Sequence, residues 1–484
     1  MPFDSLEQFI KAADEVGELA RIEGADLESD VGGLTELVAE RRGPMLLFDR
    51  FVGFPPGHRV VSNPLRTPRR FALAMDFPLN AHPVELVRFW KERKAKMTTI
   101  APRIVDDGPV LSFRQSGDEV DINAFPVPKW HPRDGGRYIG TGDMVVVRDP
   151  DNDWVNVGTY RAMIQAKDRV SLWINPQKHG RIIVERYWER GKAAPVAVVF
   201  GAEPVTWMAA GMSPPFGTCE YEVAGAYRGA PVDLVRLPTT ELPVPAQAEI
   251  VIEGEIPPLT EESAQEGPFG EWPGYYAHTG REAVVRIKNI YNRARPILLG
   301  MPPLRPLGDG SSIGIPTLTV QLWEHLERSG VTDVSGVWSF GNQLLVVVAI
   351  KQRYAGHAQQ ALFSVAGFRH GDMKRYYVVV DDDIDPSNLE EVVWAISTRV
   401  DPAKSVTILQ GGWTGGLDPM LSPEQRQAND LTMGRMLINA CIPWSWRDQF
   451  PAANVFTREQ RRALEQKWSG FLAGLYQRLE SPAL

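Results

Sequence analysis

The sequence predicts an α+β protein of three regions, which differ in their secondary-structure pattern. Residues 1–105 combine amphipathic helices with short apolar strands, residues 106–300 hold β-rich runs between Gly/Pro turns, and residues 301–484 alternate strands with helices. The length of 484 residues supports this division, because a domain has about 150 residues. We therefore expect an N-terminal α/β region, a middle domain with the form of a β-barrel or sandwich, and a C-terminal α/β domain.

The N-terminal region begins with a helix whose start is marked in the sequence. Ser5 is expected to cap it, with Gln8 completing a capping box, and apolar residues then recur at helical spacing up to Val16. A second helix is expected to stop at Gly43 and Pro44. Two strands and a third helix complete the region, over residues 19–23, 45–51 and 84–97.

The middle region is predicted to hold strands and a single helix. Residues that favour strands are concentrated in five runs, and the only convincing helical pattern covers residues 179–192. The five runs cover residues 144–149, 154–163, 195–201, 248–256 and 283–291. This composition favours a barrel or sandwich over a doubly wound sheet.

The C-terminal region alternates helices and strands, which is typical of a layered α/β sheet. The expected elements are helices over 317–330, 357–367 and 388–399, and strands over 343–351 and 375–385. A last helix is expected to begin at Thr457, with Gln460 three residues on, and to carry an apolar stripe for its own core or for a partner subunit. The stripe consists of Leu464, Trp468, Phe471, Leu472, Leu475 and Leu479.

Composition and charge narrow the classes of function. Hydrophobic residues make up 43% and charged residues 23% of the chain, which is typical of a globular protein, and the net charge of −8 argues against a nucleic-acid partner. No apolar run approaches the roughly 20 residues that span a bilayer, and the charged first residues do not resemble a signal peptide. Cys219 and Cys441 have no paired spacing, so we expect a cytoplasmic protein without a cysteine-built zinc site.

Residues 266–271, with the sequence EGPFGE, place two carboxylates around a tight turn. Glu266 and Glu271 would point to opposite faces of a straight strand and would stand about 140° apart on a helix, so neither regular structure brings them together. A turn at residues 267–270 can do so, and two acids in one pocket repel each other, which raises the pKa of at least one of them. The alternative is an ordinary loop with two solvated glutamates.

Two further features lie in the middle region. Asn156 and Arg161 stand in an otherwise apolar run and need polar partners if they are buried. Asn156, His179 and Glu220 form a mixed oxygen and nitrogen set that suits Mn²⁺ or Mg²⁺ better than Zn²⁺. A single histidine such as His179 is more often structural, so the spacing alone leaves both interpretations open.

Several stretches together resemble the UbiD-like family of reversible decarboxylases, which use prenylated FMN. In chain order they are NVGTYRAM, WINPQKHGRII, GMSPPFGTCEYEVAGAYRG, EGPFGEWPGYY and DDDIDPSNLEEVVWAISTRVDP. The resemblance covers nearly the whole chain. It implies a central flavin-binding domain like a split β-barrel and a C-terminal domain that mediates oligomerisation.

The resemblance also implies a cofactor site. Asn156, His179 and Glu220 would hold Mn²⁺ or Mg²⁺ against the flavin phosphate, with K⁺ or Na⁺ beside it on backbone carbonyls. Other cofactor contacts would come from Gly158, Thr159, Tyr160, Arg161, Lys178, Met212, Ser213 and one of Lys374 and Arg375. The alternative for Lys374 and Arg375 is a solvated pair at the start of a strand.

Arg161, Glu266 and Glu271 would form the catalytic network of the family. The guanidinium of Arg161 can bind one carboxylate bidentately and keep it ionised, and Glu266 is the better candidate for this partner. Glu271 would then be the acid–base group that protonates the substrate adduct after CO₂ has left, with the flavin as electron sink.

The resemblance further implies the substrate class and the partners. The stretch GGLDPMLSP looks like the hydroxyaromatic branch of the family and favours a hydroxy- or heteroaromatic acid over an α,β-unsaturated acid of the cinnamic type. A separate flavin prenyltransferase would supply the cofactor. The chain would form a homo-oligomer, either a dimer or a hexamer.

Two other classes of function stay open at this point. A metal-dependent hydrolase could use Glu266 and Glu271 as acid and base, but it would leave Arg161 without a role. A non-catalytic subunit of a multi-subunit carboxylase is the other alternative. The intact set of one arginine and two glutamates argues against it.

Other motifs carry less weight. GTGDMVVV leads into a strand and lacks the third glycine of a dinucleotide-binding fingerprint, and QGGWTGGLDP lacks the Lys-Ser/Thr of a P-loop. The second motif is expected to form a loop near the pocket or between domains. His278 is expected to be structural, and Cys219 has no neighbouring base that would make it a nucleophile.

Overall fold

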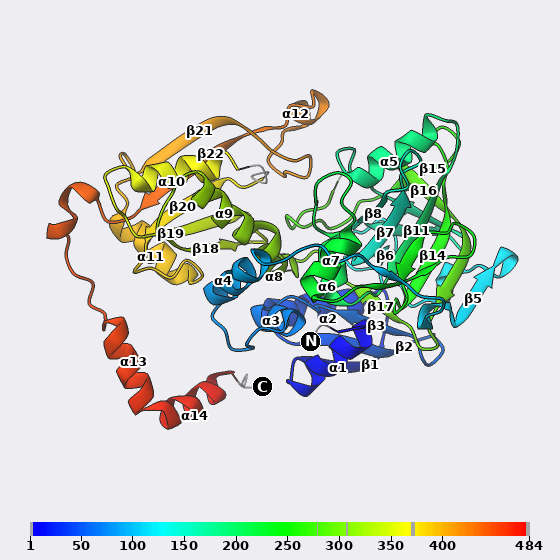
Figure 1. Cartoon of the computed structure of the whole chain (residues 1–484), viewed down its shortest axis with the longest axis horizontal. Helices are drawn as coiled ribbons and strands as arrows, with labels where there is room; N and C mark the ends of the chain where they lie inside the picture. Colours follow the sequence, from blue (N-terminus) through cyan, green and yellow to red (C-terminus); the bar gives the residue numbers. More distant parts are fainter. Residues whose placement is uncertain (1–2, 278, 306–307, 369–372, 481–484) are drawn as a thin grey trace. The chain divides into compact units, whose positions relative to one another are not determined.

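The computed structural model describes residues 3–277, 279–305, 308–368 and 373–480. Met1–Cys441 form one compact unit and Ile442–Leu484 a second. The described strands of the first unit form four sheets, and helices lie against them (Figure 1). A mixed α/β protein with an N-terminal domain, a curled central sheet and a C-terminal α/β sheet is therefore confirmed.

The N-terminal region contains a four-stranded sheet with the order β1-β2-β3-β17. Its last strand comes from a distant part of the sequence and pairs in parallel with β3. This region therefore depends on the following one for a complete sheet. The elements are α1 (Leu6–Glu15), β1 (Leu19–Ala25), α2 (Val31–Glu40), β2 (Met45–Phe51), β3 (Arg59–Ser62), α3 (Pro68–Met75), α4 (Pro83–Lys94) and β17 (Ile297–Gly300).

Helix α1 begins where the sequence predicts. The N–H of Gln8 donates to the Ser5 hydroxyl at 3.2 Å, so the predicted cap is confirmed. The predicted capping box is wrong, because the Gln8 side chain accepts from the N–H of Asp4 at 2.9 Å and not from that of Ser5.

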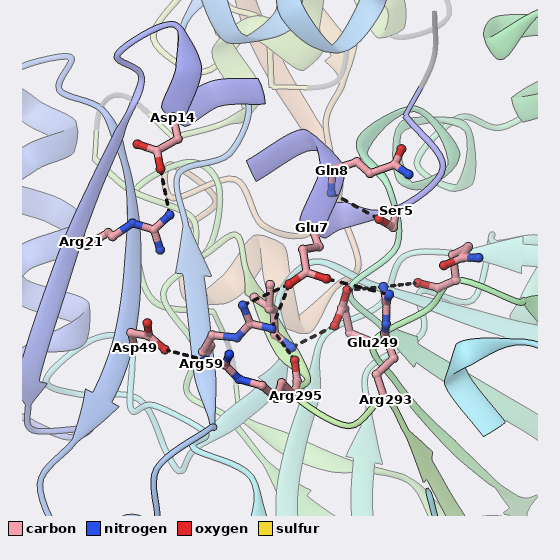
Figure 2. Close-up of polar contacts among 12 residues, drawn as sticks. Ser5, Glu7, Gln8, Asp14, Arg21, Asp49, Arg59, Glu249, Arg293 and Arg295 are labelled. Atoms are coloured by element: carbon pink, nitrogen blue, oxygen red, sulfur yellow. Dashed lines mark hydrogen bonds and ion pairs between the residues drawn. The ribbon is translucent and has the colours of Figure 1, made fainter. Parts of the chain in front are cut away.

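Ion pairs connect α1 to the neighbouring sheets (Figure 2). Glu7 lies 3.3 Å from Nη1 of Arg59 and 3.9 Å from Nη2 of Arg293. Arg293 also pairs with Glu249 at 3.1 Å. Glu249 is buried, and burial raises its pKa to about 7 although Arg293 opposes the shift. The stability of this junction is therefore expected to depend on pH.

The central region is a curled ten-stranded sheet. Eight strands follow the order β6-β9-β10-β16-β14-β11-β7-β8, while β15 and β5 both pair with β16. The strands are β5 (Phe113–Ser116), β6 (Tyr138–Gly140), β7 (Asp143–Arg148), β8 (Val155–Gly158), β9 (Ala162–Ala166), β10 (Arg169–Leu172), β11 (Ala194–Phe200), β14 (Ile250–Ile256), β15 (Ser263–Glu266) and β16 (Gly280–Asn292).

Both faces of this sheet are buried, because successive side chains of a strand point to opposite faces. In β11, Ala197 and Val199 belong to one apolar cluster, and Val196 and Val198 belong to another. Nearby lie a small sheet and three one-turn helices, namely β4 (Arg103–Ile104), β12 (Asp233–Arg236), β13 (Pro243–Pro245), η1 (Pro109–Leu111), η2 (Gly117–Glu119) and η3 (Ile122–Ala124).

The central region also holds α5 (His179–Trp188), α6 (Pro204–Ala210) and α7 (Glu220–Arg228). The sequence predicted only α5, so the expectation of a single helix was wrong. Every residue of α6 is buried, and a helix without an exposed face lacks the amphipathic pattern that reveals helices in a sequence.

The predicted run over residues 154–163 is two strands, not one. The chain leaves the sheet between β8 and β9, and residues 159–161 connect them. Arg161 therefore stands directly before the first residue of β9 and not inside a strand.

The C-terminal region is a layered sheet with the order β18-β19-β20-β22-β21. Val346 and Val348 of β19 face one apolar cluster with α10, and Val347 and Ala349 face another with α11, so helices cover both faces. The elements are α8 (Gly310–Gly314), η4 (Ile315–Thr319), α9 (Val320–Arg328), β18 (Val334–Phe340), β19 (Leu345–Ile350), α10 (His357–Ala366), β20 (Tyr376–Asp381), α11 (Leu389–Arg399), β21 (Val406–Trp413), α12 (Pro423–Gln427) and β22 (Thr432–Ala440).

The second unit has two longer helices where the sequence predicts one. They are α13 (Arg458–Lys467) and α14 (Ser469–Glu480), and a short η5 (Trp444–Gln449) precedes them. Thr457 caps α13 in a capping box with Gln460, as predicted. The helix ends at Trp468, whose φ of −110° and ψ of 20° are not helical. Across the described ranges, no helix has both the length and the apolar character that crossing a membrane requires.

Candidate active site

Arg161 lies between the two glutamates of the EGPFGE turn. Its Nε and Nη2 donate to the two carboxylate oxygens of Glu266 at 2.8 and 2.6 Å, and its Nη1 donates to Oε1 of Glu271. The side chains of Arg161, Glu266 and Glu271 are 5%, 1% and 11% exposed, so the alternative of solvated glutamates is wrong. The three residues that the sequence singled out are in direct contact.

The two glutamates have different surroundings. Glu266 accepts a further hydrogen bond from the hydroxyl of Tyr138 at 2.6 Å, whereas Oε2 of Glu271 accepts a longer one, of 3.3 Å, from the N–H of Trp272. Burial raises the pKa of Glu271, although Arg161 opposes the shift. Burial disfavours the charge of Arg161, but the hydrogen bond to Glu266 and both carboxylate charges outweigh it and raise the pKa of Arg161. Glu266 therefore accepts three hydrogen bonds and Glu271 two.

A second loop holds the EGPFGE turn in place. The N–H of Gly135 donates to the carbonyl of Pro268 at 2.7 Å, and the N–H of Gly270 donates to Asp134 at 3.0 Å. A Cβ on Gly135 would lie 2.1 Å from the carbonyl oxygen of Gly267, so a larger residue does not fit there. The Gly267–Pro268 peptide bond is cis.

Two cavities adjoin each other, and the larger one reaches this network. The larger, of about 770 Å³, is lined by Arg161 and Glu271 and by an aromatic set made of Trp173, Trp207, Phe269, Trp272 and Trp413. The smaller, of about 290 Å³, is lined by Asn156, His179 and Glu220. The two share the lining residues Thr159, Tyr160, Asn175, Gln177, Lys178 and Trp413. One end of the site is therefore aromatic and the other polar.

The polar end has unsatisfied hydrogen-bonding capacity. Nδ2 of Asn156 and the N–H of Val157 donate to Glu220 at 2.8 and 2.7 Å. Oδ1 of Asn156 is buried and has no hydrogen-bond partner among the described residues. Burial raises the pKa of Glu220 to about 8, although the hydrogen bonds from Val157 and Asn156 oppose the shift. An orphaned amide oxygen beside a buried acid fits a hard divalent cation.

Two helices begin at the polar end. His179 is the first residue of α5 and Glu220 the first of α7. Lys178 precedes α5 at the N-cap position without a side-chain cap, and its ammonium group donates to the hydroxyl of Ser213 at 3.3 Å. Helix N-termini favour anions because their N–H groups are unpaired and the helix dipole is positive there. The donor set therefore fits a phosphate group and a cation together.

The proposed metal set differs from an all-acid or all-histidine site. In the part of the chain that the structure describes, no group of three or more His, Cys, Asp and Glu side chains is placed to hold a metal ion. The set here has the amide of Asn156 as its third member.

Most of the predicted cofactor residues line these cavities. Gly158, Thr159, Tyr160, Lys178, Met212 and Ser213 line the smaller one. Lys374 and Arg375 line neither cavity. Arg375 donates to both carboxylate oxygens of the buried Asp418 at 2.8–3.1 Å, and Lys374 is buried, so a solvated pair does not describe them. A phosphate contact from either of them stays a prediction.

Sequence reasoning missed Tyr138, Asp134 and His131. Burial lowers the pKa of His131, but the hydrogen bond to Asp134, the charge of Asp134 and the hydrogen bond to the Pro303 carbonyl together outweigh burial and raise the pKa. Their segment, HPRDGGRY, has the composition of an ordinary Gly/Pro turn before a strand, and only the fold brings it against residues 267–270. Burial raises the pKa of the Cys219 thiol to about 12, which agrees with the expectation that it is not a nucleophile. His278 lies outside the described residues.

Comparison with models of protein families identifies the family to which the chain belongs. The family models for 3-octaprenyl-4-hydroxybenzoate carboxy-lyase (UbiD) match it with their N-terminal domain over residues 10–90, their Rift-related domain over 103–306 and their C-terminal domain over 311–440. The chain belongs to the UbiD family. This UbiD chain is a carboxy-lyase of the class that depends on prenylated FMN, and the hydrolase alternative is wrong.

Relatives of this UbiD chain cover nearly all of it. It is 32% identical over 473 residues to the pyrrole-2-carboxylic acid decarboxylase of Pseudomonas aeruginosa, covering 92% of this chain and 93% of that protein. The vanillic acid decarboxylase of Sedimentibacter hydroxybenzoicus in its open form has a TM-score of 0.87 and 26% identity, covering 98% of this chain and 100% of the other. The UbiD-class enzyme HmfF of Pelotomaculum thermopropionicum in complex with FMN has a TM-score of 0.82 and 27% identity, covering 93% and 97%. An evolved dimeric form of HmfF is in complex with prenylated FMN.

Proposed function

We propose that this enzyme catalyses the reversible, non-oxidative decarboxylation of a hydroxy- or heteroaromatic carboxylic acid. The observation that carries the proposal is that Arg161 binds Glu266 bidentately and leaves Glu271, with a raised pKa, at the wall of a cavity rich in aromatic side chains. The names of two relatives support the substrate class, since they are decarboxylases of pyrrole-2-carboxylic acid and vanillic acid.

The two cavities suit prenylated FMN. Asn156, His179 and Glu220 would hold Mn²⁺ or Mg²⁺ beside its phosphate, where the N-termini of α5 and α7 favour an anion. K⁺ or Na⁺ would lie near Met212, which lines the same cavity. When bound, prenylated FMN supplies the electron sink for decarboxylation.

The protein's own residues position the acid and move one proton. The aromatic set holds a flat ring and excludes water, and Arg161 binds the carboxyl group of Glu266 bidentately. As the bond between the ring carbon and the carboxylate breaks and CO₂ leaves, the carboxyl group of Glu271 donates its proton to that carbon, and a new C–H bond forms. Glu271 then recovers a proton from solvent, and in the reverse direction it removes one from the ring carbon.

We place the domain boundaries at residues 1–105, 106–300 and 301–484 and assign flavin binding to the middle domain. The C-terminal domain would form a dimer or hexamer, and Trp468 and Phe471, which are 52% and 61% exposed in the single chain, could contribute. Cys219 and Cys441 are both free thiols, which agrees with a cytoplasmic enzyme. A flavin prenyltransferase would supply the cofactor.

The test is a panel of acids with protein produced alongside a flavin prenyltransferase. CO₂ release and proton exchange at the ring carbon are measured for pyrrole-2-carboxylate, vanillate and cinnamate. Turnover of at least one aromatic acid is expected. Turnover of cinnamate alone would place the enzyme among decarboxylases of unsaturated acids, and a flavin-loaded protein without any turnover would favour a non-catalytic subunit.

A further inference from the structure

Tyr138 contacts Glu266, the glutamate that is not assigned the role of proton donor. Its hydroxyl donates to Oε1 of Glu266 at 2.6 Å, and the same oxygen accepts from Nε of Arg161 at 2.8 Å. Oε2 of Glu266 accepts from Nη2 of Arg161 at 2.6 Å. Glu266 therefore has three donors, and one of them does not come from the arginine that it shares with Glu271.

The hydroxyl of Tyr138 is held by regular structure. Tyr138 begins β6 and pairs with Met163 of β9, the strand that directly follows Arg161. Its ring packs on Phe269 with a centroid distance of 4.1 Å, and its carbonyl accepts from the indole N–H of Trp130 at 2.9 Å. Tyr138 is fully buried, and these contacts fix the direction of its hydroxyl.

We propose that Tyr138 is a positioning residue that keeps the catalytic proton on Glu271 and off Glu266. This inference rests on the roles given to the two glutamates above. Both acids share the charge of Arg161, so the proton resides on the acid whose anion has the weaker hydrogen bonds. Without the hydroxyl, Glu266 would compete for the proton, and Arg161 would turn its charge towards Glu271.

The size of the effect follows from the strength of a hydrogen bond to a charged group. The loss of one such bond changes the distribution of the proton between the two acids by about 10- to 100-fold. A protonated Glu266 leaves Glu271 ionised and unable to donate. We therefore expect a lower kcat with unchanged substrate binding. On the acid limb of the pH profile, the variant should lose activity at a higher pH than the wild type does.

The experiment compares Tyr138→Phe with a matched control, Tyr291→Phe. Tyr291 is also buried and also donates to a buried glutamate, Glu253, at 2.9 Å, but it lines neither cavity. With flavin-loaded enzyme, kcat and KM are measured from about pH 5 to about pH 9. For Tyr138→Phe we expect kcat to fall about 10-fold or more and the acid limb to move up by about one pH unit, with KM and flavin content unchanged. Tyr291→Phe is expected to behave as the wild type.

A second readout does not require turnover. Infrared spectra of the cofactor-free protein, labelled with ¹³C-glutamate, report the protonated carboxyl band, and Glu266→Gln and Glu271→Gln assign it. In Tyr138→Phe the band of Glu266 is expected to appear at higher pH than in the wild type. Turnover and titration equal to those of Tyr291→Phe would overturn the inference, and so would loss of the fold or of flavin in Tyr138→Phe.

The outcomes separate this inference from the proposed function. Unchanged CO₂ release in Glu271→Gln would refute the proposed role of Glu271, whatever Tyr138→Phe does. An inactive Glu271→Gln together with a normal Tyr138→Phe would refute the role of Tyr138 alone.

Discussion

Arg161 makes two hydrogen bonds to Glu266 and one to Glu271. This unequal sharing of one guanidinium gives two carboxyl groups of the same chemistry different environments. Glu266 has the larger number of donors, whereas burial at the cavity wall raises the pKa of Glu271.

The planar guanidinium of Arg161 is expected to be indispensable. Lysine keeps the charge but cannot bind a carboxylate bidentately, so Arg161→Lys should lower kcat by about 100-fold or more, or about 3 kcal/mol in activation free energy. Flavin absorbance and CO₂ release are measured on the same preparation. Arg169→Lys is the control, because Arg169 forms a partly exposed pair with Glu262 at 2.9 Å and its loss should cost little. Equal kcat in the two variants would contradict the account.

The fit of Gly135 against the EGPFGE turn is expected to limit activity. In Gly135→Ala, the new Cβ meets the carbonyl oxygen of Gly267, so the turn and Glu271 must shift and kcat should fall by about 100-fold. Gly33→Ala is the control, since a Cβ there has no atom within 4 Å and α2 should be stabilised by up to about 1 kcal/mol. Steady-state kinetics and thermal melts check both variants. Wild-type kcat in Gly135→Ala would show that this contact does not position the turn.

The polar end of the site is expected to hold both a cation and the flavin. Glu220→Gln removes the charge that would face the cation, so bound divalent metal and flavin should both fall about tenfold or more. Elemental analysis and flavin absorbance measure the two losses, and a chelator should release flavin from the wild type. Glu222→Gln, in the same helix, is the control and should keep both. Flavin retention at the wild-type level in Glu220→Gln, with metal absent, would contradict a metal-bridged phosphate.

The junction between α1 and the neighbouring sheets is expected to lose stability as the pH rises. The pKa of buried Glu249 is raised to about 7, so the folded state holds a proton that the unfolded state releases at a lower pH. The stabilisation is complete below about pH 4.5 and is lost as the pH rises through about 7. Glu249→Gln does not titrate. Its free energy of unfolding relative to that of the wild type should therefore rise by roughly 3 kcal/mol between about pH 4.5 and about pH 7. Urea midpoints at the two pH values measure the difference, and a constant difference would refute it.

Helices and strands with a clear capping residue or a clear hydrophobic periodicity were predicted from the local sequence. Ser5 and Thr457 cap helices as expected, and the strands predicted over 343–351 and 375–385 are β19 and β20. The other three strands of the C-terminal sheet, β18, β21 and β22, were not predicted. Elements buried on every side were missed, as in α6, and the predicted terminal helix did not reveal its break at Trp468. Propensity alone does not mark such a break, because tertiary context overrides it.

The sequence predicted which residues form the site but not how they are arranged in space. The family resemblance named Arg161, Glu266 and Glu271, and the turn argument explained how two acids could meet. Tyr138 and Gly135 were not predicted, because their contacts join segments more than 100 residues apart in the chain. Lys374 and Arg375 show the reverse case, in which a resemblance named residues that line neither cavity.

The most direct test of the central claim is CO₂ release by Glu271→Gln loaded with prenylated FMN, assayed on the best acid of the panel. Glutamine is nearly isosteric but cannot donate a carboxyl proton, so the account predicts a loss of about 1,000-fold or more with flavin and metal content unchanged. CO₂ release and proton exchange at the wild-type rate would contradict it.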